Sequence, residues 1–285
     1  MRAADAFWDF SWNPFSGCRY ASPGCLNCYA PGYVPLQKSR HNPLYEGITT
    51  WRFGRAVFNG FLKERPADHP DWGLPFRYKV PNPVMGPGER SICFCCDMCD
   101  LFLPEAGLLP GRPTRLIDQV VGRVAVSGHI GLLVTKHPDV MRRYFLGERS
   151  PRMRRLWQES LWLVFSAENQ KWFNKRWPSM RDLARRGWFV GVCIAPMLGP
   201  VKLPADFLKY ASWVICYGEQ SCGSGWRPMD ANWARAVKKQ CREAGIPFFF
   251  KQMAGKRPIP YDLRVKDFPK LGPLARRLRK KGRNA

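Results

Sequence analysis

The sequence contains no apolar run that approaches the roughly 18 residues needed to span a membrane. Residues 1–12 also lack an apolar stretch of signal-peptide length followed by a small-residue cleavage site. With 25 glycines and 26 prolines among 285 residues, the composition is not that of a low-complexity chain. These absences predict a soluble, cytoplasmic globular protein without a membrane partner.

Acidic residues are scarce relative to basic ones. The chain has 22 Asp and Glu residues against 46 Lys and Arg residues, which leaves a formal net charge of +24 at pH 7. A charge of this size favours a polyanionic partner and predicts contact with nucleic acid, either DNA or RNA. A basic surface that is merely solvated is the alternative that charge alone leaves open.

Disulfides are not expected, because the chain has no export signal and an odd number of cysteines, 11 in all. Three of the thiols gather in the segment WNPFSGCRYASPGCLNCYA, residues 12–30. There Cys18, Cys25 and Cys28 are spaced C-x6-C-x2-C on turns that contain Gly and Pro. In a reducing compartment, clustered thiols indicate metal or redox chemistry.

Spacing alone leaves three interpretations of these cysteines open. Three thiolates do not complete a tetrahedral zinc site, so zinc would need a fourth ligand, for which His41 is the candidate. A [4Fe–4S] cluster held by three cysteines instead leaves one iron open for a small-molecule ligand. The third interpretation is that the cysteines are plain thiols.

Short apolar segments recur along the chain without polar alternation, as expected of strands buried on both faces of a parallel sheet. They are residues 7–12, 91–96, 129–135, 161–167, 188–195, 212–218 and 247–252. Helix-compatible stretches lie between them at 112–124, 174–187 and 230–245. The last has Asp230 as its expected N-cap and Gly245 as its stop. Its expected apolar face holds Trp233, Ala236, Val237 and Cys241.

The alternation of strands and helices predicts an α/β fold. We expect a full or partial (β/α) barrel of six to seven parallel strands, with a doubly wound sheet as the main alternative. Residues 1–268 are expected to form one domain that carries a Pro-, Gly- and aromatic-rich insertion at about 31–90. Residues 269–285 are expected to form a basic C-terminal tail.

Polar residues directly follow the apolar segments, in DMCD, TKHPD, SAENQ and GEQSCGSG. In a parallel β/α fold the loops after the strands converge at one edge of the sheet. This placement favours an enzyme over a passive binding module. It predicts a common site for Asp100, Lys136, Glu168, Asn169, Gly218 and Glu219.

Six segments resemble an uncharacterised, phage-associated family of radical S-adenosylmethionine (SAM)-like proteins. Running in order from residue 12 to residue 256, they are WNPFSGCRYASPGCLNCYA, DMCDLF, LLVTKHPDVM, LWLVFSAENQ, PMLGPV and WVICYGEQSCGSGWRPMDANWARAVKKQCREAGIPFFFKQMAGK. The resemblance implies a radical-SAM-like barrel with a [4Fe–4S] cluster on Cys18, Cys25 and Cys28. It also implies SAM as a cofactor, an electron donor protein, and a location in a bacterial host cytosol, with the protein phage-encoded or bacterial.

The chain departs from the pattern that it resembles at three places. Radical SAM enzymes usually leave three residues between the first two cysteines, whereas six lie between them here. Ala195 stands where the family usually has a glutamate, and Tyr217 where it tends to have a glycine. Altered or reduced activity is expected if the missing carboxylate binds substrate or cofactor.

The resemblance gives expected roles to the residues at the strand ends. Glu168 and Asn169 would meet the ribose hydroxyls of SAM, Gly218 would let the backbone approach it, and Glu219 would bind its ammonium or a ribose hydroxyl. Lys136 is expected to hold the SAM carboxylate or a substrate phosphate, and Asp100 to orient substrate or pair with Lys136. The structural alternatives are a helix cap at Glu168, a surface arginine partner for Glu219, and a plain ion pair between Asp100 and Lys136.

A second group of thiols, CFCCDMC, contributes Cys93, Cys95, Cys96 and Cys99. Alternation along a strand would send Cys93 and Cys95 to one face and Cys96 to the other, which makes a poor four-ligand set. Cys96 or Cys99 near the barrel mouth would suit a hydrogen donor or auxiliary ligand. Cys193 and Cys216, inside apolar segments, are expected in the core.

Two basic segments are candidates for nucleic-acid contact. In residues 141–155, arginines are interleaved with Tyr144 and Phe145, a mixture that suits a phosphate backbone plus base stacking, although a solvated helix flank fits as well. The candidate residues are Arg142, Arg143, Arg152, Arg154, Arg155, Arg276, Arg277, Arg279, Lys280 and Lys281. The sequence thus predicts a radical SAM-type enzyme that modifies a nucleic-acid base or nucleotide. The alternative is a zinc-stabilised nucleic-acid-binding protein without catalysis.

Overall fold

The computed structural model describes residues 6–39, 42–52, 54–86, 89–104, 116–147, 150–220 and 225–270. Its centre is one sheet of seven parallel strands, which follow one another in space in the order in which they occur in the chain. They are β1 (Phe10–Trp12), β6 (Ile92–Cys95), β7 (Ile130–Thr135), β8 (Leu161–Ala167), β9 (Val190–Ile194), β10 (Trp213–Cys216) and β11 (Phe248–Phe250).

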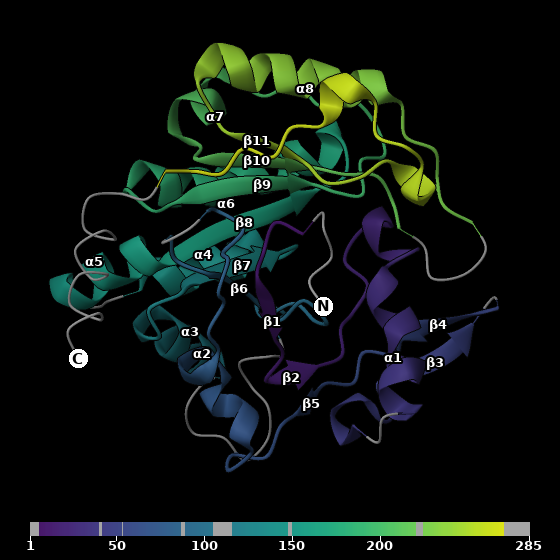
Figure 1. Ribbon diagram of the computed structural model, residues 1–285, viewed down its shortest axis with the longest axis vertical. Coiled ribbons are helices and arrows are strands. Elements are labelled where there is room, and N and C mark those ends of the chain that lie inside the picture. Colours follow the sequence, from purple (N-terminus) through teal and green to yellow (C-terminus); the bar gives the residue numbers. More distant parts are fainter. Residues whose placement is uncertain are drawn as a thin grey trace.

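The sheet curls into a half-barrel, with β1 and β11 at its two edges (Figure 1). The fold is therefore a partial α/β barrel, and each of the seven apolar segments predicted from the sequence contains one of its strands. Sequential order is the arrangement that right-handed βα units produce when each new strand is added beside the last one. The doubly wound alternative is excluded, because such a sheet reverses its strand order.

The strands are apolar on both sides because each side packs against a separate cluster. All seven residues of β8 are buried, and they alternate between the two clusters. Leu163 and Phe165 face the larger cluster, which the helices cover, whereas Trp162 and Val164 face a smaller cluster on the inner side of the curl. The inner cluster includes Phe7 and Phe249 from opposite ends of the chain, whose ring centroids are 5.7 Å apart.

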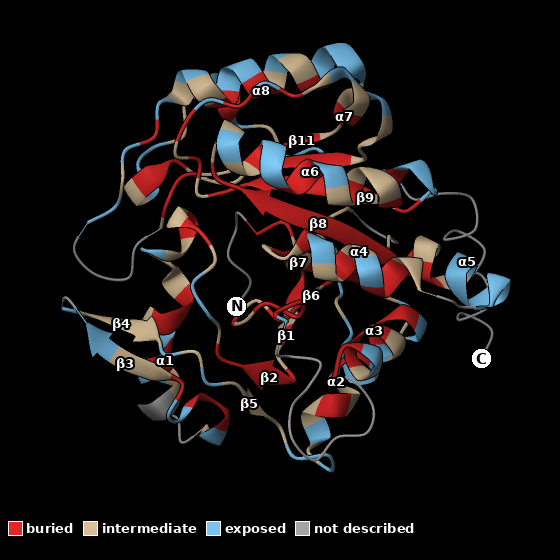
Figure 2. Ribbon diagram, turned by 180° about the vertical axis from the view of Figure 1, so that it is seen from behind, coloured by how far each residue is buried: buried red, intermediate tan, exposed pale blue. Residues whose placement is uncertain are grey.

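Helices cover the outer face of the sheet, with their buried sides against it and their exposed sides outward (Figure 2). They are α3 (Leu116–Val126), α4 (Pro138–Leu146), α5 (Pro151–Ser160), α6 (Gln170–Arg185), α7 (Ala205–Tyr210) and α8 (Ala231–Ala244). In α8 the Asp230 carboxylate accepts a hydrogen bond from the Asn232 backbone at 2.8 Å, and Gly245 ends the helix with φ 67°. The predicted apolar face was wrong at one position, because Ala236 is exposed and Ala234 is buried instead.

A long connection joins β1 to β6 and contains the cysteine motif and the predicted insertion. Its elements are β2 (Phe15–Ser16), η1 (Pro23–Cys25), α1 (Tyr29–Ser39), η2 (Pro43–Tyr45), β3 (Thr49–Arg52), β4 (Arg55–Phe58), β5 (Lys63–Glu64), η3 (Pro70–Gly73) and α2 (Leu74–Arg77). Trp72 from this connection packs in the larger core cluster, and Trp12 of β1 donates its indole N–H to the Asp71 carbonyl at 2.8 Å. The connection therefore packs onto the barrel.

The cysteine motif lies at the edge of the sheet where the strands end. In Figure 1, β8 and β9 point toward the side of the molecule that carries α1 and the β3–β4 hairpin. After β11 the chain continues through η5 (Ala254–Lys256) and η6 (Tyr261–Leu263). None of the helices in these described ranges is long and apolar enough to cross a membrane.

Candidate functional site

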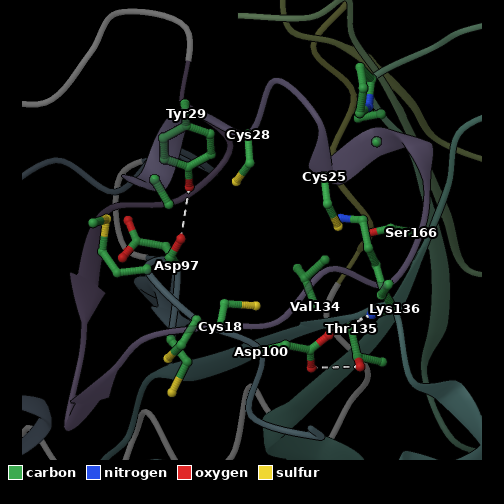
Figure 3. Close-up of a pocket in the computed structure, with 18 of the residues that line it drawn as sticks. Cys18, Cys25, Cys28, Tyr29, Asp97, Asp100, Val134, Thr135, Lys136 and Ser166 are labelled. Carbon is green, nitrogen blue, oxygen red and sulfur yellow. Dashed lines mark hydrogen bonds between the residues drawn. The ribbon is translucent and has the colours of Figure 1, made fainter. Parts of the chain in front are cut away.

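The three cysteines of the motif surround one cavity of about 150 Å³, which we call the thiol cavity. Figure 3 shows the sulfur atoms of Cys18, Cys25 and Cys28 turned toward the same hollow. Residues from the ends of β6, β7, β8 and β10 complete its wall, among them Asp100, Lys136, Ser166 and Glu219. The structure thus brings the motif together with Asp100, Lys136 and Glu219, as the sequence predicts, whereas Glu168, Asn169 and Gly218 do not line the cavity.

The loop that carries the cysteines is shaped by its glycines and by short backbone hydrogen bonds. Gly17 has φ 93°, and a Cβ there would lie 2.1 Å from the Phe61 carbonyl oxygen, so only glycine fits. The Cys25 N–H donates to the Ser22 carbonyl at 2.8 Å, and the Cys28 N–H to the Cys25 carbonyl at 3.3 Å. These turns place Cys25 and Cys28 on either side of Leu26 and Asn27, directly before α1.

Glu168, at the end of β8, anchors the first half of this loop. The Ser22 hydroxyl donates to its carboxylate at 2.5 Å, and the Arg176 guanidinium of α6 pairs with it at 3.0 Å. The Glu168 carboxylate is fully buried, so these partners offset the cost of removing its charge from water. Gly24 packs against it so closely that a Cβ would lie 2.5 Å from a carboxylate oxygen.

Glu219, after β10, anchors the second half. The Asn27 amide donates to it at 2.9 Å, and Arg227 pairs with it through its guanidinium and through its backbone N–H at 2.8 Å. Arg227 also donates to the Pro23 carbonyl at 3.0 Å. Burial alone would raise the pKa of Glu219, but the hydrogen bonds from Arg227 and Asn27 outweigh it and hold that pKa below its ordinary value.

These contacts assign structural tasks to the residues expected to bind SAM. Glu168 binds the loop through Ser22. Glu219 lines the thiol cavity, and its carboxylate accepts hydrogen bonds from Arg227. The Asn169 side chain caps α6 by accepting from the Trp172 N–H at 3.3 Å. Gly218 lets its strand end approach the chain after β11, because a Cβ there would lie 2.1 Å from the Ala254 nitrogen. Contact between these residues and SAM stays a prediction.

Asp100 and Lys136 both line the thiol cavity, but they do not form the expected side-chain ion pair. The Asp100 carboxylate accepts from the Thr135 hydroxyl at 2.7 Å and from the Lys136 backbone N–H at 2.8 Å. It therefore fixes the turn after β7, and the Lys136 side chain runs toward Cys25 (Figure 3).

The Lys136 ammonium is held charged by its surroundings. Burial alone would lower the pKa of Lys136, but Cys25, Glu168 and Cys28 outweigh it and raise that pKa above its ordinary value. Conversely, burial is the main cause that raises the pKa of the Cys18 thiol, followed by Asp100 and by the thiols of Cys28 and Cys25. The three thiols and the ammonium are thus close enough to influence one another's charge.

The arrangement of the donors bears on the choice between zinc and a cluster. No set of three or more His, Cys, Asp or Glu side chains in the described part of the chain is placed to hold a single metal ion. His41, the fourth zinc ligand expected from the sequence, lies outside the described residues. A [4Fe–4S] cluster binds each of three protein thiolates through a different iron and would need its donors spread around a hollow, whereas a single zinc ion would need them around one point.

The other cysteines lie either in the core or at the thiol cavity, as their positions relative to the strands predict. Cys93 and Cys95 are buried in the larger core cluster with their sulfurs 3.8 Å apart, whereas Cys96 and Cys99 line the thiol cavity. Cys99 donates its thiol to the Phe15 carbonyl at 3.3 Å. Cys193 and Cys216 are buried, which confirms their place in the core.

Several residues of the site were not found from the sequence. Ser22, Asn27, Arg176 and Arg227 complete the two anchors, and of these Ser22 and Asn27 lie inside the motif itself. An arginine partner for Glu219 was expected as the structural alternative, and the structure identifies it as Arg227. The sequence did not indicate which arginine it would be, because an arginine eight positions after a glutamate carries no recognisable signal. Two of the three departures from the resembled pattern, Ala195 and Tyr217, line the thiol cavity.

The basic segment at 141–155 differs from its expected form. Tyr144 and Phe145 are buried among Trp157 and Trp188, so the proposed stacking of bases on these two rings was wrong. Amphipathic spacing on α4 turns both rings toward the core, since only one face of the helix meets solvent.

The described arginines of the segment remain at the surface. Arg142 pairs with Asp182 at 2.7 Å, Arg143 with Asp139 at 3.3 Å and Arg155 with Glu159 at 3.4 Å, while Arg152 and Arg154 are exposed on α5. Figure 1 places α5 at the end of β8 away from the cysteine motif. The basic tail residues Arg276, Arg277, Arg279, Lys280 and Lys281 lie outside the described residues.

Comparison with known proteins gives one match. A family model described as "Protein of unknown function (DUF5131)" matches residues 4–281. No curated protein and no solved structure matches the chain.

Proposed function

We propose that this chain, which belongs to the DUF5131 family, is a radical SAM-type enzyme that acts on a nucleic-acid base or nucleotide. One observation carries the proposal. Three cysteines that are ten residues apart at most in sequence turn their thiols into one cavity, at the edge of a parallel half-barrel where strand-end residues converge. The carboxyl edge of such a sheet is the usual position of an active site.

Cys18, Cys25 and Cys28 would hold a [4Fe–4S] cluster. With three protein ligands, such a cluster keeps one iron open for SAM and supplies the electron that cleaves it reductively. The residues of the chain fit this group in two respects. The donors are soft thiols around one hollow, and Lys136 brings a positive charge to the same wall, where it offsets the negative charge of bound thiolates.

The two anchors hold the loop in position before any ligand binds. Glu168 fixes the loop through Ser22, and Glu219 fixes it through Asn27, from strands that are two places apart in the sheet. Each anchoring carboxylate is itself paired with an arginine, Arg176 or Arg227. A donor set fixed by such outer contacts does not need to be ordered at the moment of binding, which favours affinity.

Lys136 is the cavity residue best suited to hold an anionic group. Its ammonium makes no hydrogen bond or ion pair with any residue in the described ranges, although its pKa is raised by the neighbouring thiols and Glu168. The carboxylate of SAM or a phosphate of the substrate would form an ion pair with this ammonium. An electron donor protein, also predicted from the resemblance, would reduce the cluster.

The proposal is tested by reductive cleavage of SAM under anaerobic conditions. Protein reconstituted with iron and sulfide and reduced with dithionite should release methionine from SAM. Cys25→Ala should release none, while the matched core variant Cys193→Ala should release methionine at the wild-type rate, because Cys193 is buried in β9. Equal release by wild type and Cys25→Ala would refute the function.

A further inference from the structure

A second and larger cavity opens beside the thiol cavity. It has a volume of about 610 Å³, within the range of roughly 300–1,000 Å³ that is typical of small-molecule sites. The two cavities share part of their walls, so a molecule in the larger one lies beside the thiol cavity. The shared residues are Trp8, Tyr29, Asp97, Met98, Gln220 and Lys251.

Aromatic rings form the inner wall of this cavity, which we call the aromatic cavity. Trp8, Tyr29, Tyr33 and Tyr45 line it, from the N-terminal segment, α1 and η2. Tyr45 is buried, and Tyr29 and Tyr33 meet edge to face with ring centroids 5.9 Å apart. Such walls take up a flat ring, and the side-chain amides of Gln37 and Gln252, which also line the cavity, supply hydrogen-bonding partners for a heterocycle.

Cations lie at the rim of the aromatic cavity. Lys256 and Arg257 are exposed at its mouth, and the Lys251 ammonium lies over the Trp8 ring, 5.0 Å from its centroid. Asp97 is the one acid among the described lining residues, and its carboxylate already accepts from Ser11 at 2.7 Å and from Asn13 at 2.6 Å. Lys251 and Arg257 also contact aromatic rings, since the Arg257 guanidinium lies 4.6 Å from the centroid of the Trp226 ring. The excess of positive over negative charge among the lining residues nevertheless favours an anion.

We propose that the aromatic cavity binds a nucleotide, with its base between the tyrosines and Trp8 and its phosphate at Lys256 and Arg257. Only a ligand that is flat at one end and anionic at the other satisfies both walls. The inference rests on the proposed function for its purpose, since it names the substrate class, but the binding site stands on the cavity alone. The nucleotide is either free or one unit of a nucleic-acid strand.

The test measures binding of guanosine 5′-monophosphate and of guanosine to the full chain by isothermal titration calorimetry. Guanine is chosen because SAM carries adenosine, and an adenine probe would report on two sites. The phosphate should make the monophosphate bind about tenfold more tightly than guanosine. Equal affinities, or no binding of the monophosphate at millimolar concentration, would overturn the proposal.

Variants distinguish the contribution of the cations at the rim from that of the aromatic wall. Lys256→Asn/Arg257→Gln should reduce the monophosphate to the affinity of guanosine, and Asn is chosen because Lys256 has φ 55°, a region that asparagine tolerates. Tyr33→Ala should weaken both probes. The matched control, Lys239→Gln/Arg242→Gln, removes two exposed cations from α8 and should change neither affinity. A loss in the control as large as that in the rim variant would contradict the assignment.

A short single-stranded oligonucleotide distinguishes the two sources of the nucleotide. If the natural ligand is a strand, the oligonucleotide should bind more tightly than the monophosphate and lose affinity in the rim variant. If it is a free nucleotide, the monophosphate should bind and the oligonucleotide should not. In either case, failure of the monophosphate to bind refutes the site.

The same measurement on Cys18→Ala/Cys25→Ala/Cys28→Ala separates this inference from the proposed function. Nucleotide binding should persist in the triple variant, because no cysteine of the motif lines the aromatic cavity. Retained nucleotide binding in a wild-type protein that takes up no iron would leave the site intact and remove the radical chemistry. Iron uptake without nucleotide binding would refute the nucleotide site and leave the radical chemistry possible.

Discussion

At the scale of single residues, the site depends on contacts that leave no room for an added atom. Gly24 lies between Pro23 and Cys25 in the motif, and its Cα packs against the buried carboxylate of Glu168. The sequence marks Gly24 only as a turn residue. Glycine is required there because Glu168 packs against it. Glu168 comes from a distant part of the chain, since it lies 146 positions after its hydrogen-bonding partner Ser22 in the same loop.

Gly24→Ala should therefore destabilise the protein. Its Cβ would lie 2.5 Å from a Glu168 oxygen and 2.7 Å from the Glu168 Cγ, so the buried Glu168–Arg176 pair must shift. We expect a loss of about 1–3 kcal/mol in the free energy of unfolding, measured in urea, together with weaker iron uptake. Gly122→Ala is the matched control, since Gly122 lies inside α3 with no atom within 4 Å of an added Cβ. It should leave stability unchanged or raise it by about 0.4–1 kcal/mol, and equal losses in the two variants would contradict the packing argument.

The three cysteines should be separable from the other thiols one residue at a time. Cys18→Ala, Cys25→Ala and Cys28→Ala should each abolish the binding of iron on anaerobic reconstitution, because a cluster held by three thiolates does not survive the loss of one. Cys193→Ala and Cys216→Ala remove buried thiols of β9 and β10 and should bind iron as the wild type does. Iron content is measured by colorimetric assay, and retention in all three motif variants would refute the assignment.

At the scale of elements, the sequence predicts strands better than it predicts what the loops do. The segment 161–167 coincides with β8 because a strand buried on both faces is apolar at every position. The helix caps at Asp230 and Gly245 could likewise be predicted, since both are local. The arginine partner of Glu219 was expected as an alternative, but the anchoring of the cysteine loop by Glu168 and Glu219 could not be predicted, because Ser22 and Asn27 are far from these carboxylates in the chain.

The anchor at Glu219 should make stability depend on pH. The pKa of this carboxyl group is lower in the folded protein than its ordinary value of 4.5. Such a group stabilises the fold at pH values above 4.5 and loses this contribution as the pH falls through its folded value. Glu219→Gln should therefore be less stable than wild type at neutral pH, and its urea midpoint should fall less between neutral and acidic pH.

The control for this prediction is Glu243→Gln. Glu243 is exposed on α8 and pairs with Lys239 only at 3.9 Å, a surface contact that contributes little. Its pH profile should match that of the wild type. A wild-type profile in Glu219→Gln would show that the anchor does not contribute to stability.

At the scale of the whole molecule, the exposed arginines of α5 and the candidate site lie at different places. The net charge of +24 predicts a polyanionic partner, yet the exposed arginines of α5 lie away from the cysteine motif. The strand-end residues, the motif and the aromatic cavity gather at the opposite edge of the sheet. The exposed arginines of α5 and the proposed site are therefore two separate places on the molecule.

Binding of DNA or RNA should depend steeply on salt. The logarithm of the affinity should fall linearly with the logarithm of the salt concentration, by about 0.9 for each phosphate neutralised on duplex DNA. Deleting residues 276–285 removes six basic residues and should make this slope shallower without changing iron content. The exposed arginines on α5 should retain part of the affinity, and Arg152→Gln/Arg154→Gln should reduce it further. Affinity is measured by fluorescence anisotropy. An affinity that does not change with salt would contradict phosphate binding and would mean that the positive charge is only a solvated surface.

The presence of a cluster is measured by the metal content and absorption of the full chain, reconstituted with iron and sulfide and handled without oxygen. We expect a brown protein with about four iron and four sulfide ions per chain and broad absorption near 400 nm. We further expect that adding SAM changes the electron paramagnetic resonance spectrum of the reduced protein, because SAM binds the open iron. A colourless protein that holds one stoichiometric zinc ion and does not respond to SAM would contradict the proposed function.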